Sequence, residues 1–365
     1  MAIATKRGCI VFASQLLLIL LLFISPSLQQ QRRDVPTVES KFDQMEEFDG
    51  GSYFMGVTHP EYEYKGEHPV RQEYVKPFAM DRYPVTNQQF SEFVYDTKFF
   101  RTDPELKGFS YVFFQHMKQA AKLMEKYKLL DEPWWLPIAG ARWYQPYGPE
   151  SSWKDGLANH PAVHIGAADA DSYCKWKGKR LPTEFEWEYA ARANNKSWIY
   201  PWGDHYRKMR MNTWQGLFPY ENMGFDGHKG LAPVDAYPQQ NHRDMYDMLG
   251  NTWEWTSTEY YGSDRPPGKV WLILKGGSFV DSIDEGINTI VRTSTKIGRE
   301  IDFTAENIGF RCARTIIPKP EVKPQRVIRL EDTWEYKQSQ KEKKARLEKL
   351  QKTQKVNVKQ YRFEL

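Results

Sequence analysis

Residues that could carry out redox or nucleophilic chemistry are missing from the stretch 278–286, SFVDSIDEG, which contains no Cys, His or Lys. The residues before it, LKGG, are typical of a strand that enters a glycine turn. Cysteine is scarce throughout, with three residues in a chain of 365. Thiolate chemistry inside this stretch is therefore excluded, although GNTWEWTSTEYYG (250–262) and ENIGFRCAR (306–314) have the character of segments that support a site.

The signatures of several other classes of protein are also absent. Val280 stands where a nucleophile elbow needs its last glycine, and the spacing of a phosphate-binding loop is missing. There is no EF-hand pattern and no repeat of 20–50 residues. His160 and His164 suggest a metal site, but the proline between them and the lack of a third soft ligand nearby favour packing or capping.

The N-terminus lacks a hydrophobic run long enough to cross a bilayer comfortably. Lys6 and Arg7 precede the apolar run LLLILLLFI (16–24), which is followed by Ser-Pro-Ser. This order predicts a cleaved secretory signal peptide over residues 1–27, hence no membrane attachment after cleavage, with an uncleaved anchor as the alternative. Loss of both cations lowers the net charge from +4 to +2, which gives no argument for a nucleic-acid partner.

The C-terminal part, residues 317–365, has too little apolar surface for a core. A proline-spaced linker leads into a segment rich in Lys, Glu and Gln. The pairs Glu342/Arg346 and Glu348/Lys352 are four residues apart, so we expect a solvated helix. Its basic character indicates a solvated tail or, as the alternative, a contact with a partner or nucleic acid. The last four residues, RFEL, predict a variant retrieval signal, with a chance ending as the alternative.

Residues 35–316 remain as one domain with a sizeable core. Abundant Trp, Tyr, Gly and Pro suit a loop-rich fold with irregular turns packed by large rings. Helices early in this range and short strands late in it predict a compact α+β domain. The expected strands are a hairpin edge at 48–56 and a strand over 75–86 that runs to Thr86. A helix is expected after the capping box of Thr86 and Gln89, and further helices over 113–130 and over 167–179, the latter ended by Gly178. The last expected helix lies within 181–193 and begins at the capping box of Thr183 and Glu186.

Two cysteines remain once Cys9 leaves with the signal peptide. Cys174 and Cys312 form an even pair in a chain bound for an oxidising compartment, so we expect a disulfide between them. Two buried, unpaired thiols are the alternative.

Oxygen atoms that could bind a cation are better represented than sulfur. The segments 211–230 and 247–256 combine Asn and acidic side chains with glycine-rich bends. Calcium takes six to eight oxygens, many from backbone carbonyls in flexible loops. These segments therefore suggest calcium sites, with solvated turns as the alternative.

A series of motifs occurs in a recognisable order between about Gly50 and Arg314. They are HPAVHIGAADADSYCKWKGKRLPTEFEWEYAARA, YPWGD, NTWQGLFP, APVDAYP, MYDMLGNTWEWT, LKGGSF and NIGFRCAR. In this order they resemble the formylglycine-generating enzyme (sulfatase-modifying factor) family. The resemblance implies a single compact domain with little regular secondary structure and a C-type-lectin-like fold.

The resemblance also implies an activity and its loss. Active members oxidise a sulfatase cysteine to formylglycine with molecular oxygen and a copper ion held by two cysteines, which correspond here to Asp281 and Gly286. Ser278 keeps the family's serine, but copper(I) prefers thiolates, so we expect no copper and no oxidation. The pattern resembles the catalytically silent branch of the family. That branch implies a protein of the endoplasmic reticulum (ER) lumen that binds sulfatases or the active enzyme, with a possible homo- or heterodimer, and modulates formylglycine formation.

Further residues are carried over from the family motifs. The implied calcium ligands are Asn212, Thr213, Asp226 and His228 in a first set, and Asp247, Gly250, Thr252 and Glu254 in a second set. The family disulfide matches Cys174 and Cys312, whereas Ala191 replaces the first cysteine of a second family disulfide. Asn195 begins the sequon Asn-Lys-Ser and is a candidate glycosylation site.

Two other functions stay open at this point. The chain is alternatively an active oxidoreductase that converts a sulfatase cysteine to formylglycine through unfamiliar ligands. A lectin-like sugar binder rests on fold analogy alone.

Overall fold

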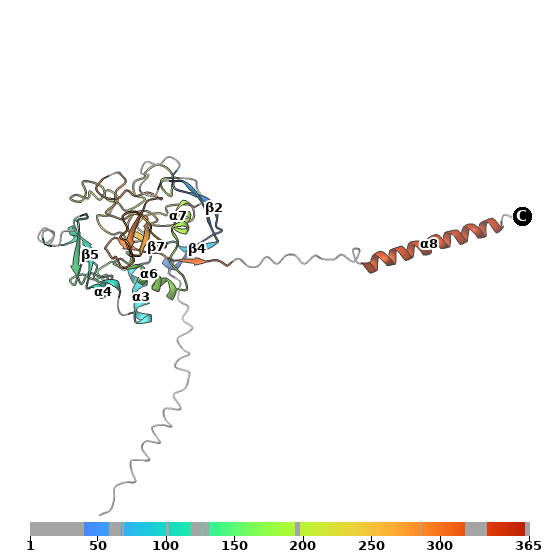
Figure 1. The fold of residues 1–365 in the computed structure, drawn as a ribbon, viewed down its shortest axis with the longest axis horizontal. Coiled ribbons are helices and arrows are strands. Elements are labelled where there is room, and N and C mark those ends of the chain that lie inside the picture. The colour runs from blue at the N-terminus through green and yellow to red at the C-terminus, as the bar shows by residue number, and fades with distance from the viewer. Residues whose placement is uncertain are drawn as a thin grey trace, which may run out of the picture. The chain divides into compact units, whose positions relative to one another are not determined.

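The computed structural model divides the chain into two compact units, residues 1–316 and residues 317–365 (Figure 1). The predicted signal peptide, Asn195 and the RFEL ending lie outside the residues that the structure describes. The described residues are 40–57, 67, 69–99, 102–117, 126, 131–193, 198–284, 286–317 and 334–361.

The first unit is built from short strands in four small sheets. The three-stranded sheet has the antiparallel order β1 (Met45–Phe48), β4 (Phe78–Asp81), β11 (Ala313–Thr315), and β2 (Gly51–Met55) pairs with β3 (Arg71–Val75). The hairpin edge predicted at 48–56 is wrong in its pairing. The turn at Gly50, where φ is 72°, separates strands that belong to different sheets, because β2 takes β3 as its partner.

The four-stranded sheet lies at the centre of the unit, with β7 between α6 and α7 in Figure 1. Its order is β10 (Ile308–Gly309), β7 (Trp253–Glu259), β8 (Trp271–Lys275), β9 (Lys296–Glu300), and a separate pair joins β5 (Phe109–Phe113) to β6 (Trp135–Ala139). The β10–β7 contact is parallel and the others in the sheet are antiparallel. This arrangement places the residues just before β10 beside the start of β7.

The helices begin where their capping residues predict. They are α3 (Asn87–Thr97), α4 (Asp103–Lys107), α6 (Ala167–Trp176) and α7 (Glu184–Arg192), with 3-10 turns η1 (Lys41–Asp43) and η3 (Phe114–His116). The capping boxes at Thr86 and Thr183 are both formed, since each threonine side chain accepts from the backbone N–H three residues on. Gly178, where φ is 68°, follows the end of α6.

The helix expected over 113–130 is wrong at its start. Phe113 ends strand β5, and residues 114–116 form η3, while most of the rest of that range lies outside the described residues. The run FSYVF of β5 is rich in aromatic and β-branched side chains, which favour a strand, and it pairs with β6 along its whole length.

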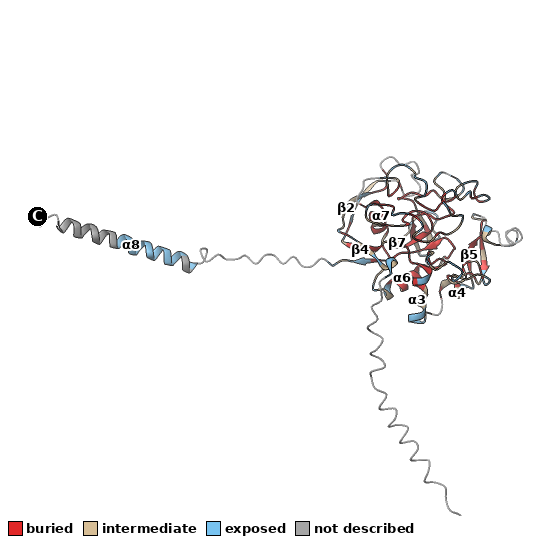
Figure 2. Ribbon diagram, turned by 180° about the vertical axis from the view of Figure 1, so that it is seen from behind, coloured by how far each residue is buried: buried red, intermediate tan, exposed pale blue. Residues whose placement is uncertain are grey.

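Buried residues, red in Figure 2, fill the interior of the first unit, and many of them are aromatic. Trp187, Trp214, Trp253 and Trp255 are among the largest fully buried side chains. Their packing in place of long regular elements confirms the predicted α+β fold with little regular secondary structure.

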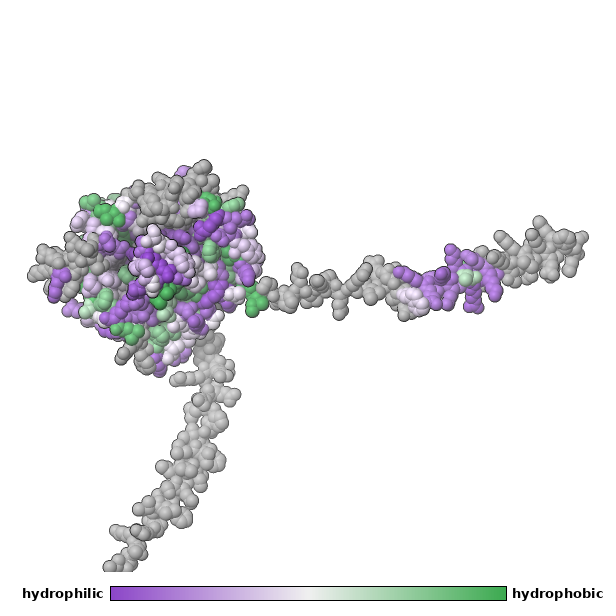
Figure 3. Space-filling view, in the orientation of Figure 1, coloured by the Kyte–Doolittle hydropathy of each residue, from purple (hydrophilic) through white to green (hydrophobic). Residues whose placement is uncertain are grey.

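The second unit contains helix α8 (Trp334–Tyr361). The described part of α8 is exposed (Figure 2) and mostly hydrophilic (Figure 3). Leu347, which is 59% exposed, is one of its few apolar side chains. Across the described parts of the chain, no helix is both long and apolar enough to cross a membrane.

Candidate functional site

Two glycines direct the chain from β8 toward Ser278. Gly276 and Gly277 have φ values of 103° and 76°, in the left-handed region that glycine adopts without strain. A Cβ at Gly276 would lie 2.8 Å from the carbonyl oxygen of Met248, and one at Gly277 would lie 2.7 Å from a methyl group of Val291. The turn therefore needs both glycines, and it places Ser278 in the interior.

The side chain of Ser278 is held by two partners. Its Oγ donates to Asp281 Oδ2 at 2.5 Å and accepts from Asn307 Nδ2 at 2.9 Å. The backbone N–H of Ser278 donates to the same carboxylate oxygen at 2.8 Å, and the N–H of Asp281 donates back to the Ser278 carbonyl at 3.0 Å. Asp281 thus closes a turn on Ser278, and its carboxylate is committed to that turn.

Burial raises the pKa of the Asp281 carboxyl to about 6, although the hydrogen bonds from Ser278 act in the opposite direction. The folded protein therefore holds this proton more tightly than the unfolded chain does. Stability from this group is fully present below pH 4 or so and is lost as the pH rises toward 6.

Asp281→Asn removes this titration. We expect the free energy of unfolding of the natural protein, minus that of the variant, to fall by about 2–3 kcal/mol between pH 4 and pH 6. Urea denaturation of both proteins across this range measures it. Asp284→Asn, a change in the exposed part of the same loop, is the control and should leave the difference flat. A difference that stays flat or rises between pH 4 and pH 6 for Asp281→Asn would contradict a raised pKa of the Asp281 carboxyl.

Gly286, the second position that corresponds to a copper-binding cysteine of the active members, is exposed and lies in the same loop. Asn288 closes the loop, because its Nδ2 donates to the Val280 carbonyl at 2.7 Å and its Oδ1 accepts from Ser282 Oγ at 2.8 Å. The structure thus places Asp281 and Gly286 in one loop, in which Asp281 is buried and Gly286 is exposed.

Two cavities flank this loop. A cavity of about 250 Å³ is lined by Asp281 together with Asp131, Glu132 and several aromatic side chains, including Trp135 and Trp253. A second cavity, of about 480 Å³, is lined by Gly286 and mostly by apolar side chains, including Leu217, Met223 and Phe225. Phe218, Ile287 and Asn288 line both, so the loop separates an acidic, aromatic cavity from an apolar one.

The first set of candidate calcium ligands is brought together. The carboxylate of Asp226 accepts from the backbone N–H groups of Thr213, at 2.8 Å, and His228, at 3.2 Å. Asp226 is buried, and among the described residues it forms no ion pair with a lysine or arginine. Asn212 Oδ1 and Thr213 Oγ1 are buried without a hydrogen-bond partner in the described structure. These unsatisfied oxygens around a buried carboxylate fit a hard cation.

The second set lies beside the first. A Cβ at Gly250 would lie 2.5 Å from the Asn212 carbonyl oxygen, and Thr252 Oγ1 is a buried oxygen without a partner in the described residues. The carboxylate of Glu254, however, already has a cationic partner. It accepts from Arg311 Nε and Nη2, both at 2.7 Å, and from Trp187 Nε1 at 2.8 Å. Glu254 therefore neutralises Arg311. Calcium at the second set stays a prediction, and its expected main charged ligand, Glu254, is already paired with Arg311.

Sequence reasoning missed the residues that connect these groups. Asn251 accepts from Asn212 Nδ2 at 3.0 Å and donates to Asp247 Oδ2 at 2.9 Å, which joins the two sets. Its φ of 64° is a conformation that asparagine tolerates, so the Gly-Asn dipeptide was the available signal. Arg311 and Asn307 carried no local signal, because their partners lie far away in the sequence.

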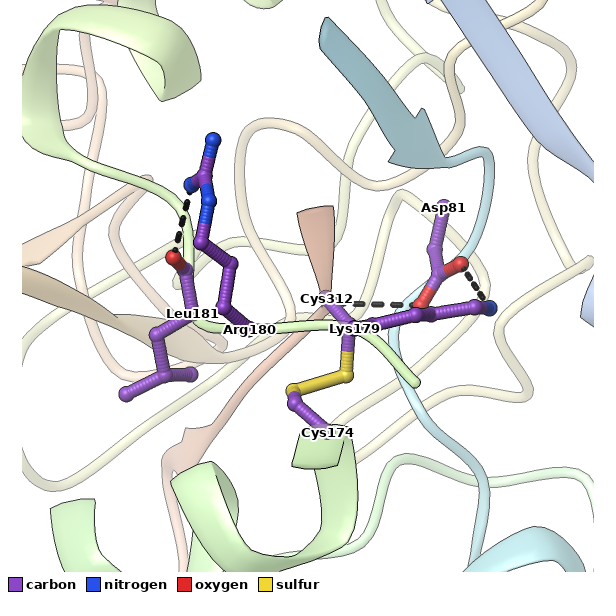
Figure 4. Close-up of a disulfide and its surroundings, with 6 residues drawn as sticks. All are labelled: Asp81, Cys174, Lys179, Arg180, Leu181 and Cys312. Atoms are coloured by element: carbon purple, nitrogen blue, oxygen red, sulfur yellow. Dashed lines mark hydrogen bonds and ion pairs between the residues drawn. A yellow bond between two sulfur atoms is a disulfide. The ribbon is translucent and has the colours of Figure 1, made fainter. Parts of the chain in front are cut away.

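The predicted disulfide is confirmed. Cys174 in α6 and Cys312, just before β11, are bonded across 138 residues and are fully buried (Figure 4). Asp81 braces the bridge, since its carboxylate accepts from the Cys312 N–H at 3.0 Å and from Lys179 Nζ at 2.5 Å. The bridge ties the helical side of the core to the strand that ends the first unit.

The histidine pair 160/164 does not form a metal site in the described structure. Both ring nitrogens of His164 are engaged, with Ser110 Oγ and the Pro146 carbonyl, each at 2.8 Å. No group of three or more His, Cys, Asp or Glu side chains that could hold a metal ion occurs in the described ranges. The packing interpretation of His164 is confirmed.

The chain is similar to proteins of one family. The model of the sulfatase-modifying factor enzyme 1-like domain matches residues 31–316. "Inactive C-alpha-formylglycine-generating enzyme 2" of Bos taurus is 42% identical over 269 residues, which cover 74% of this chain and 87% of the relative. "Formylglycine-generating enzyme" of Mus musculus is 37% identical over 284 residues, which cover 73% of this chain and 74% of the relative.

Among solved structures, PvdO from Pseudomonas aeruginosa shares the fold. Its TM-score is 0.50 at 23% identity, over 74% of this chain and 94% of that one. That likeness concerns the fold, whereas the family model and the more similar relatives span most of the sequence. The chain therefore belongs to the family of sulfatase-modifying factor enzyme 1-like domains.

Proposed function

We propose that this chain is a catalytically silent member of its family, which binds sulfatases or the active formylglycine-generating enzyme and modulates formylglycine formation without performing it. Family membership and the buried disulfide indicate a protein of the secretory pathway. Within that pathway we propose the ER lumen as its compartment.

The observation that carries the proposal is the chemistry of the Asp281 loop. In active members two cysteines hold copper at the positions of Asp281 and Gly286. A carboxylate hydrogen-bonded to Ser278 and a glycine offer no thiolate to copper(I). Cys174 and Cys312 are bonded to each other, and Cys9 lies outside the described residues. The relatives named inactive, from Bos taurus and Mus musculus, are both 42% identical to this chain, which supports the same reading.

The two cavities beside the loop support a binding role. Leu217, Phe225 and Ile287 are 68%, 65% and 71% exposed, although all three are large and apolar, and all three line the larger cavity. Contiguous exposed apolar surface of this kind marks interaction sites. An extended client segment that crosses the loop would place one side chain in the acidic, aromatic cavity and another in the apolar one.

A binding assay tests this proposal on the full chain with a labelled sulfatase-derived cysteine peptide. Leu217→Glu should weaken binding about tenfold or more, because it puts a charge into the apolar cavity. Val270→Glu, at another exposed apolar position, is the matched control and should leave binding unchanged. No measurable binding by the natural chain, or equal loss in both variants, would contradict a client site at this loop.

We also propose calcium at the first ligand set, held by Asn212, Thr213, Asp226 and His228. Calcium there would supply positive charge to the buried Asp226 carboxylate and to the unsatisfied oxygen of Asn212. It would stiffen a glycine-rich segment that has few regular hydrogen bonds of its own.

Removing calcium with a chelator is expected to lower the melting temperature by several degrees, and Asp226→Asn should abolish that dependence. Differential scanning fluorimetry with and without added calcium measures the shift, and elemental analysis measures bound metal. Asp264→Asn, at an exposed position, is the control and should keep the calcium response. A natural chain that carries no calcium and melts independently of it would rule out the site.

A further inference from the structure

Positive charge is concentrated outside the folded domain. Residues 317–365 contain fourteen lysines and arginines and seven acidic residues, a net charge of +7, which leaves residues 1–316 at −3 because the whole chain is +4. Helix α8 alone carries nine basic and three acidic residues. The residues from Lys337 to Lys349 are all exposed (Figure 2), and most of this stretch is hydrophilic (Figure 3).

The lysines of α8 are not spread evenly around the helix. Lys337, Lys341 and Lys344 are spaced by four and three residues, which places them on one face. The same face takes the sequence positions of Lys352, Lys355 and Lys359. At about 100° per residue, these six positions fall within a sector of roughly 80°. We call them the lysine stripe; Glu348 is the one acidic position within it, and Lys343, Arg346 and Lys349 lie on the opposite side.

We propose that the lysine stripe of α8 is a binding surface for a linear sulfated polysaccharide. The stripe runs from Lys337 to Lys359, and these 22 steps of 1.5 Å make about 33 Å, which suits an extended chain that carries charge at regular intervals. Ammonium groups bind sulfate as point charges, and binding to a polyanion of high charge density gains free energy from released counterions.

The composition of α8 disfavours other partners. A helix that inserts into a membrane surface or packs on another protein needs an apolar face. Of the four aliphatic residues of α8 beyond alanine, Leu347, Leu350 and Val358 fall on one side of the helix with Tyr336 and Tyr361, whereas Val356 does not. Gln340, Lys343 and Gln354 occupy the same side, so polar and charged residues interrupt this apolar face. Nucleic acid is not the expected polyanion for a protein of the secretory pathway. Binding that depends on charge alone, along one face, therefore points to a sulfated chain in the secretory pathway or outside the cell.

The test uses the full chain and a heparin dodecasaccharide at near-physiological salt, measured by calorimetry or biolayer interferometry. The triple variant Lys337→Gln, Lys341→Gln, Lys344→Gln should weaken binding by about tenfold or more. The matched control, Lys343→Gln, Arg346→Gln, Lys349→Gln, removes the same charge from the other side and should weaken binding no more than about threefold. Circular dichroism checks that both variants keep the helix.

Hyaluronan, which carries carboxylates and no sulfate, and vesicles that contain phosphatidylserine are the comparison ligands. The proposal expects no saturable binding to either. Equal loss of heparin affinity in the two triple variants, no binding of the natural chain to heparin, or binding to the vesicles as tight as to heparin would each overturn the lysine stripe as a sulfated-polysaccharide site.

Discussion

Cys174→Ser is expected to lower the free energy of unfolding by roughly 4–5 kcal/mol, because the bridge closes a loop of 138 residues in the unfolded chain. The loss is large relative to the usual total stability of a domain. It also leaves Cys312 as a free thiol beside the carboxylate of Asp81. Thermal and urea unfolding of the oxidised protein and the variant measure the difference.

The double variant Cys174→Ala, Cys312→Ala separates the loop effect from the unpaired thiol. It should lose most of the same stability, since the chain-entropy contribution is gone in both cases. An unchanged melting temperature in the single and double variants would mean that the bridge does not hold the core together.

Arg311→Met is expected to cost about 3–5 kcal/mol, because it leaves the carboxylate of Glu254 buried without its cation. Arg311 and Glu254 are both fully buried, and the guanidinium also donates to the Asp247 carbonyl at 2.9 Å and the Tyr246 carbonyl at 2.8 Å. One side chain thus fixes the loop that precedes β7. Urea unfolding at neutral pH measures the cost.

Two further variants test whether the cost of Arg311→Met comes from the unpaired Glu254 carboxylate. Arg299→Met breaks a partly buried pair with Glu132, whose side chains keep 26% and 35% of their exposure, and should cost only about 1 kcal/mol or less. The double variant Arg311→Met, Glu254→Gln should recover part of the loss, because no charge is then left unpaired. If Arg311→Met cost as little as Arg299→Met, another cation would have to balance Glu254, and the second calcium set would gain support.

Local sequence signals predicted the elements whose cause is local. The capping boxes at Thr86 and Thr183 set the starts of α3 and α7, and Gly178 marks the end of α6, because each signal acts within a few residues. The start of the helix expected over 113–130 failed for the converse reason. Its apolar spacing also fits a strand, and pairing with β6, more than twenty residues away, decides the outcome.

The candidate site was predictable in its residues but not in its connections. The glycine turn, Ser278 and Asp281 stand together in the sequence. The partners that fix them do not: Asn307 is 29 residues from Ser278, and Arg311 is 57 residues from Glu254. Such pairs depend on the parallel placement of β10 beside β7, which no local pattern specifies. The engagement of Glu254 by Arg311 therefore appears only in the folded structure.

The central claim is that this chain holds a client without oxidising it. The most direct measurement incubates the purified full chain with a sulfatase-derived cysteine peptide, copper(I) and oxygen, and follows formylglycine by mass spectrometry and bound copper by elemental analysis. An active formylglycine-generating enzyme run in parallel shows that the assay works. We predict an unmodified peptide and copper well below one ion per chain. Formylglycine that increases with the amount of this protein, together with one tightly bound copper ion per chain, would contradict the account.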